Sequence, residues 1–350
     1  DHALANGLAA IDAIERTQGV DHADLVLSLN SLAHTYTAQG HPEDARVHLE
    51  RALQIAVAQL GRQHPLTATV HNTLGVALMN ESRWDEALTH YRRALEIREA
   101  AFGPIHPAVA SSLSNMAAPF LVRTEMEMAL SWLRKAEAVW DQLPGDDPDV
   151  AYVYASLAGA LSHTGAIDEA IGYGRRAVEI WSNDPGPRHQ VVGALGNLGG
   201  LLFRYRDEME GLAMLRRALR ISRESFEPLH RQVAEASRIL GTALLGAEID
   251  STEHVSAWLE LGEVAQARGA IDNLRFCGER AVKVSKAVGG RTMQGAEARL
   301  LLAQGLVATK GDRSRARALT REALRSLRGM GREAEAIRTR VEALHTELHP

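Results

Sequence analysis

The chain has 350 residues, of which 45% are hydrophobic and 24% charged, and its formal net charge is −5. This composition is ordinary for a folded globular protein, and the charge is too small to favour any class of charged partner. The single cysteine, Cys277, excludes an internal disulfide framework and fits a reducing compartment, so we expect a cytoplasmic protein. The chain has no apolar run of about 18 residues and no signal-peptide pattern, which predicts no membrane span.

The most informative pattern is a repeat with a period of 42 residues. The segment 61–65, Gly-Arg-Gln-His-Pro, returns 42 residues later at 103–107 as Gly-Pro-Ile-His-Pro. Alanines follow the same period, in the series Ala10, Ala52, Ala94 and Ala136 and the series Ala45, Ala87 and Ala129. A period in this range is typical of a solenoid of stacked helical pairs, so we predict an all-α fold.

Each repeat is predicted to contain a first helix (A), a tight turn, a second helix (B) and a loop. Residues 3–17 match helix B of the later repeats. Because its A helix is missing and the chain begins at Asp1 without Met, we expect a preceding domain in a longer protein. Five complete pairs are then predicted at 24–39 with 43–60, 66–81 with 84–101, 108–122 with 126–142, 149–164 with 167–182, and 190–205 with 208–224.

The pattern changes after residue 225. Residues 232–247 read as an A helix, but the polar segment 248–254 stands where its B helix should begin. We expect 248–254 to be an exposed connector and helix 255–268 to occupy the vacant B position. Further helices are predicted at 271–288, 292–309, 312–328 and 332–347. We therefore predict an N-terminal stack (1–225), an irregular segment (226–254) and a C-terminal stack with a capping helix (255–350).

The loops carry helix stop and start signals. Gly61 and Gly103 stand where a helix end favours a left-handed residue, and Pro65 and Pro107 suit the first position of the next helix. Histidines precede most of these helix starts. We interpret them as loop or cap residues, since no ligand pattern accompanies them. They are His22, His64, His106, His189 and His230.

No motif predicts catalysis, a metal or a cofactor. The glycines between 193 and 200 lie in a predicted helix with no preceding strand, which excludes a phosphate-binding loop. His345 and His349 lack the glutamate of a metalloprotease pattern, and Cys277 reads as a buried apolar residue. Residues 291–350 carry 12 Lys and Arg against 7 Asp and Glu. They lack interleaved aromatics, so we expect a solvated face and no nucleic-acid partner.

The repeats resemble the tetratricopeptide repeat. The matching residues are Leu32, Ala33, Tyr36, Gly40, Ala45, Leu49 and Ala52 in the first complete repeat, and Leu74, Gly75, Leu78, Ala87, Tyr91 and Ala94 in the second. The length and the Gly-x-x-His-Pro loop resemble the kinesin-light-chain type. This resemblance implies a right-handed superhelical solenoid of antiparallel helix pairs.

The C-terminal region resembles the tails of bacterial serine/threonine protein kinases of myxobacterial type. The resemblance rests on residues 311–319 and on a closing helix that ends in His349-Pro350. It implies a kinase domain before this region. No Gly-rich nucleotide loop, His-Arg-Asp or Asp-Phe-Gly is present, so this chain would be the sensor or docking part of such a protein.

In the tetratricopeptide family the A helices line a concave groove where ligands bind. Carried onto this sequence, the resemblance assigns a neutral wall of small residues, whose amides can bond a peptide backbone in both directions. The predicted groove residues are Asn30, His34, Thr37, Asn72, Val76, Met79, Ser114, Asn115, Leu121, Ser162, Asn197, Gly200 and Phe203.

The leading functional hypothesis is an interaction scaffold that binds a neutral to apolar peptide or protein partner and regulates an attached signalling domain. The alternative is the small-molecule sensor region of a signalling ATPase or transcription regulator. An enzyme is not expected, because the groove positions offer His34 as their one titratable group.

Overall fold

The computed structural model describes residues 2–144, 147–183, 186, 188–247, 250–289 and 292–349. The described residues form helices and loops without a strand, which confirms the all-α prediction. Contacts divide the chain into two units, residues 1–180 and 181–350. No helix in the described ranges is both long and apolar enough to cross a bilayer.

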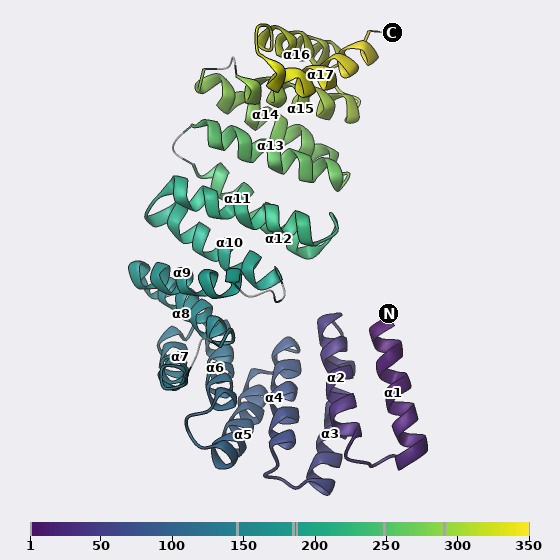
Figure 1. The fold of residues 1–350 in the computed structure, drawn as a ribbon, viewed down its shortest axis with the longest axis vertical. Coiled ribbons are helices and arrows are strands. Elements are labelled where there is room, and N and C mark those ends of the chain that lie inside the picture. The colour runs from purple at the N-terminus through teal and green to yellow at the C-terminus, as the bar shows by residue number, and fades with distance from the viewer. Residues whose placement is uncertain are drawn as a thin grey trace. The chain divides into compact units, whose positions relative to one another are not determined.

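The helices follow one another as the repeat predicts (Figure 1). The first unit holds α1 (His2–Gln18), α2 (Leu25–Ala38), α3 (Pro42–Gln59), α4 (Pro65–Asn80), α5 (Trp84–Phe102), α6 (Pro107–Val122), α7 (Met126–Trp140), α8 (Val150–Thr164) and most of α9 (Ile167–Asn183). The second unit holds α10 (Arg188–Tyr205), α11 (Glu208–Ser225), α12 (Arg231–Leu245), α13 (Thr252–Ala267), α14 (Ile271–Ala287), α15 (Met293–Ala308), α16 (Arg313–Ser326), a 3-10 turn (Arg332–Ala334) and α17 (Glu335–Glu347).

Small residues set the distance between the helices of a pair. From Ala45 to Ala136, every alanine of the two periodic series is fully buried. A Cβ on Gly75 would lie 2.4 Å from the ring of Tyr91, and one on Gly211 would lie 2.3 Å from the Phe203 backbone nitrogen. No side chain fits at these two places, so glycine lets α4 approach α5 and α10 approach α11 closely.

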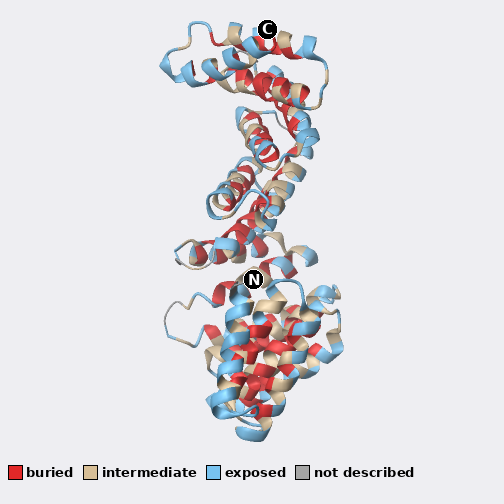
Figure 2. Ribbon diagram, turned by 90° about the vertical axis from the view of Figure 1, so that its right-hand side faces the viewer, coloured by how far each residue is buried: buried red, intermediate tan, exposed pale blue. Residues whose placement is uncertain are grey.

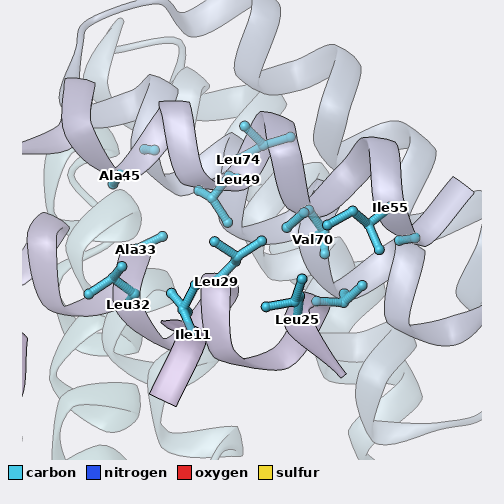
Figure 3. Close-up of a cluster of buried hydrophobic side chains, with 14 residues drawn as sticks. Ile11, Leu25, Leu29, Leu32, Ala33, Ala45, Leu49, Ile55, Val70 and Leu74 are labelled. Carbon is cyan, nitrogen blue, oxygen red and sulfur yellow. The ribbon is translucent and has the colours of Figure 1, made fainter. Parts of the chain in front are cut away.

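The core runs between the helices, where the buried residues gather (Figure 2). At the start of the first unit, α1 to α4 share one apolar cluster around Leu25, Leu29 and Leu49 (Figure 3). Each of these three leucines is fully buried. At the end of the second unit, Ile337 and Val341 of α17 close a second cluster that includes Leu300 and Leu327. The last helix therefore covers apolar surface of α15 and α16, as expected of a cap.

Most of the predicted loop signals are confirmed. Gly61 and Gly103 have φ angles of 98° and 80°, in the left-handed region. The Nδ1 atoms of His64, His106 and His230 accept a backbone N–H two residues on and so cap the helix that follows. His22 lies in a loop and accepts from the Asp24 N–H just before α2. The prediction is wrong for His189, which lies inside α10.

The second unit departs from the regular repeat at α12 and α13. Helix α12 takes an A position, because Ile239 approaches Gly196 of α10. Helix α13 lies parallel to α11: Arg216 bonds Glu260 at 2.6 Å and Arg223 bonds Glu263 at 3.0 Å. The helix predicted at 255–268 therefore lies beside α11, where the next B helix would be. Helix α13 then pairs with α14, which approaches α15 closely at Gly278 and Gly305.

Part of the predicted connector 248–254 is wrong. Helix α13 already begins at Thr252, because the Ser251 side chain caps its N-terminus. His254 is only 2% exposed, and its Nε2 lies 3.0 Å from Oε1 of Glu208 on α11. Residues 248 and 249 lie outside the described residues. The domain boundaries at 225 and 254 stay a proposal.

Candidate functional site

The A helices of the first unit bring two of the predicted amides together. Asn115 on α6 donates from Nδ2 to Oδ1 of Asn72 on α4, at 2.7 Å. Both side chains are half-buried, so solvent reaches them. The bond uses one donor and one acceptor; no hydrogen bond to the described residues occupies the Asn72 amino group or the Asn115 oxygen. The Asn72 amino group and the Asn115 oxygen, on neighbouring A helices, thus remain to bond a ligand.

Asn30 on α2 continues this row of amides but is more deeply placed. Its side chain is 8% exposed, and its Oδ1 has no hydrogen-bond partner among the described residues. A buried carbonyl oxygen without a partner costs free energy, on the order of 1–3 kcal/mol. A donor from a bound molecule would remove this cost.

The other predicted wall residues of the first unit surround this row. Exposed His34 has its Nε2 3.5 Å from the hydroxyl of Thr73, and Thr37 bonds the carbonyl of its own helix at Ala33. Ser162 likewise bonds the carbonyl of Gly159. The half-buried residues that complete the set are Val76, Met79, Ser114 and Leu121.

Two histidines lie beside the amides, on the facing sides of α4 and α5. The Nδ1 atoms of His71 and His90 are 2.9 Å apart. Burial, with smaller contributions from the neighbouring His90 and Arg93, lowers the pKa of His71 to about 4. Burial also lowers the pKa of His90. Both rings are therefore neutral at pH 7, and one Nδ1–H donates to the other Nδ1.

In the second unit, a hollow of about 480 Å³ lies between α10 and α12. The predicted residues Gly200 and Phe203 line it, whereas Asn197 is exposed but does not. Nothing lies within 4 Å of the place where a Gly200 Cβ would stand, so this glycine opens onto the hollow. The nearby Gly196 instead faces Ile239 of α12 at 3.2 Å and serves helix packing.

The predicted neutral wall is wrong at this hollow, because three charged side chains line it. They are Arg204, Glu208 and Arg238. Arg238 bonds Glu235 at 2.6 Å, and this guanidinium holds the pKa of Glu235 below its usual range. The sequence analysis did not include the α12 wall, although the repeat register places Thr242, which also lines the hollow, one period after Gly200.

Residues to which the sequence assigned no functional role are buried or hydrogen-bonded within the fold. Cys277 is buried, and burial raises the pKa of its thiol to about 11. The Nδ1 of His345 lies 2.7 Å from the hydroxyl of Thr320. Trp140, Trp181 and Trp258 are buried. In the parts of the chain that the structure describes, no three His, Cys, Asp or Glu side chains are placed to hold a metal ion.

Comparison with known proteins identifies the repeat. Tetratricopeptide-repeat family models match residues 25–66, 66–118 and 128–185. No curated protein matches the sequence.

Two solved structures are similar to part of this chain. The structure of BtubC (BKLC) from P. vanneervenii aligns with 66% of this chain and with 94% of its own chain. The sequence identity is 23% and the TM-score is 0.53. The repeats of a putative kinesin light chain from Podosopora anserina cover 58% of this chain and 97% of their own, at 20% identity and a TM-score of 0.47. The helix pairs of residues 25–118 and 128–185 are tetratricopeptide repeats.

Proposed function

We propose that the chain is a protein-interaction scaffold that holds an extended, neutral peptide across the A helices of its first unit. The observation that carries the proposal is the hydrogen bond between Asn72 and Asn115. It places amides of two successive A helices within reach of one ligand. An extended peptide presents alternating N–H and C=O groups, which suit the remaining donor of Asn72 and acceptor of Asn115.

The surroundings of the amides support a neutral ligand. Val76, Met79 and Leu121 offer apolar contact, while His71 and His90 are neutral at pH 7. The half-buried His71–His90 pair therefore adds no charge that an acidic peptide would need.

The test begins with a phage-displayed library of unstructured peptides selected on the full chain. The strongest peptide is then titrated against Asn72→Ala and Asn115→Ala variants. Losing two hydrogen bonds of about 1 kcal/mol each should weaken binding at least about ten-fold in the double variant. The matched control is Asn80→Ala, since the exposed Asn80 bonds only the Val76 carbonyl of its own helix. Equal affinities for the double variant and the control would refute the proposal.

A second candidate function is recognition of a small molecule in the hollow at Gly200. Its volume of about 480 Å³ falls in the usual range of ligand pockets. Gly200→Leu should fill the hollow. The control is Gly193→Leu on the same helix: Gly193 does not line the hollow, and a Cβ there would have nothing within 4 Å. A metabolite that stabilises wild type and Gly193→Leu against heat, but not Gly200→Leu, would support this function.

The wider setting of the chain stays a prediction. A role as the regulatory part of a larger signalling protein, such as a bacterial kinase, rests on the resemblance of residues 311–319. The cytoplasmic location rests on cysteine usage. Sequencing the complete reading frame tests the first, and imaging a tagged protein in its own cell tests the second.

A further inference from the structure

A second groove opens in the second unit beside α12, and Arg238 lines both this groove and the hollow at Gly200. The volume of the groove is about 360 Å³. Helix α12 contributes one face, and the far wall comes from α13 and the beginning of α14. The residues that line it are Ala234, Ser237, Arg238, Gly241, Leu245, Trp258, Leu261, Val264, Ala265, Arg268, Ala270, Asn273, Phe276 and Cys277.

The groove exists because α12 is packed more loosely than other A helices. A Cβ on Gly75 would lie 2.4 Å from Tyr91 of the paired helix, and one on Gly199 would lie 2.9 Å from Leu215. At the equivalent Gly241 the nearest atom is 3.8 Å away, on Leu261 of α13. Helix α13 thus lies near the B position but does not close against α12, because it also pairs with α14.

The loosened face leaves apolar side chains in water. Leu245 on α12 is 53% exposed and Phe276 on α14 is 45% exposed, and both line the groove. The four apolar residues Ile239, Leu240, Leu244 and Leu245 on α12 are too apolar to face water together. Leu240 and Leu244 are buried, whereas Leu245 is not. The side chains of an incoming helix could cover Leu245 and Phe276 together.

The charged residues that line the groove are two arginines, Arg238 and Arg268. Glu235, outside the lining, bonds Arg238 at 2.6 Å, so Arg268 is the cation offered to an incoming carboxylate. The side chain of Arg268 donates to the Pro228 carbonyl, a neutral group. Arg280 lies over the rings of Trp258 and Phe276, 5.6 and 5.9 Å from their centres. An apolar ligand with carboxylates beside its apolar face would match this surface.

We propose that this groove is a docking site for an amphipathic helix of a partner protein, with large apolar residues on one face flanked by Asp or Glu. The lining residues of α12 recur at helical spacing, at Ala234, Gly241 and Leu245, which matches anchors one and two turns apart on the partner. The partner's carboxylates would meet Arg268 and, beside the Trp258 and Phe276 rings, Arg280. This site is independent of the peptide-binding amides of the first unit.

The test uses a fluorescein-labelled helical peptide of roughly 18 residues, long enough to form a helix. It has leucines at i, i+3, i+4 and i+7 and glutamates beside them, and a second probe has lysine for every glutamate. Anisotropy with the full chain should show the glutamate probe binding at least about ten-fold more tightly than the lysine probe. Equal affinities, or no binding of the glutamate probe, would overturn the proposal.

Variants then locate the site. Gly241→Leu should weaken the glutamate probe at least about ten-fold, whereas Gly193→Leu, also a glycine-to-leucine change inside a helix, should leave its affinity unchanged. Arg268→Glu should weaken the glutamate probe and strengthen the lysine probe, a reversal that misfolding cannot produce. Asn72→Ala should bind both probes as wild type does. Unchanged binding in both Gly241→Leu and Arg268→Glu would place the peptide elsewhere and refute the docking site.

Discussion

At the residue scale, the turn between helices A and B has one left-handed position, which is glycine in some repeats and another residue in others. Gly40 and Gly165 have φ angles of 84°, and the equivalent Ser82 and Thr124 have φ angles of 60°. In the pair α15–α16 the left-handed residue is Lys310, with a φ of 52°. A left-handed conformation is least favourable for a β-branched residue such as Thr124.

We predict that Thr124→Gly stabilises the protein. Relief of the left-handed strain should exceed the added entropy of the unfolded chain by roughly 0.5–1 kcal/mol. The reverse change, Gly165→Ala, should destabilise by a similar amount, because it creates the same strain. Urea unfolding of both variants measures the two free energies. A Thr124→Gly protein that unfolds at lower urea than wild type would contradict this account.

A second residue-scale prediction concerns the histidine pair. The pKa of His71 in the folded protein is about 4, below the usual 6.5, because burial disfavours the charged ring. The folded state therefore binds fewer protons than the unfolded state. Stability is fully present above pH 6.5 and is lost as the pH falls towards 4. His71→Gln should flatten this loss in urea unfolding series, whereas His163→Gln, which changes an exposed histidine, should not.

At the scale of the element, the helix ends were predictable because each carries a local signal. The helices expected at 66–81 and 108–122 begin at Pro65 and Pro107 in the structure, and a histidine caps each of them. The start of α13 was three residues off because the Ser251 cap stands inside a polar run that read as loop. The burial of His254 could not be predicted, since it depends on Glu208, 46 residues earlier in the chain.

The candidate sites show the same limit. Asn115 bonds Asn72 although the repeat equivalent of Asn72 is Ser114, one position earlier. Gly200 and Phe203 lie about one turn apart on α10 and line the same hollow. The binding role of these residues stays a prediction. The repeat register did not predict that Gly196 packs against Ile239 while Gly200 stays open. That difference depends on where α12 packs against α10, and the sequence of α10 alone does not determine the position of α12.

An element-scale prediction tests how α13 is held. Its contacts with α11 include the Arg216–Glu260 and Arg223–Glu263 ion pairs and the His254–Glu208 contact. Glu260→Gln should increase amide hydrogen exchange in α13 several-fold, since a half-buried guanidinium loses its carboxylate. Glu253→Gln, at an exposed position on the same helix, is the control. Equal exchange in the two variants would show that the ion pair contributes nothing to docking.

At the scale of the whole molecule, stability in a stack of repeats is a sum of local terms. The apolar cluster of α1 to α4 and the cluster closed by α17 have no residue in common. The first includes Leu29 and the second Leu300, both almost fully buried. Each repeat contacts its neighbours, so a defect at one end should not reach the other.

We therefore predict that Leu29→Ala destabilises residues 25–80 and leaves residues 293–326 unchanged. Removing a buried leucine costs about 2–5 kcal/mol, which should raise amide hydrogen exchange throughout α2, α3 and α4. Leu300→Ala should produce the opposite pattern, with faster exchange in α15 to α17 alone. The two variants control for each other, because they make the same chemical change at equal burial. If either one accelerated exchange at both ends, the chain would unfold as a single cooperative unit, and the nearest-neighbour description of its stability would not hold.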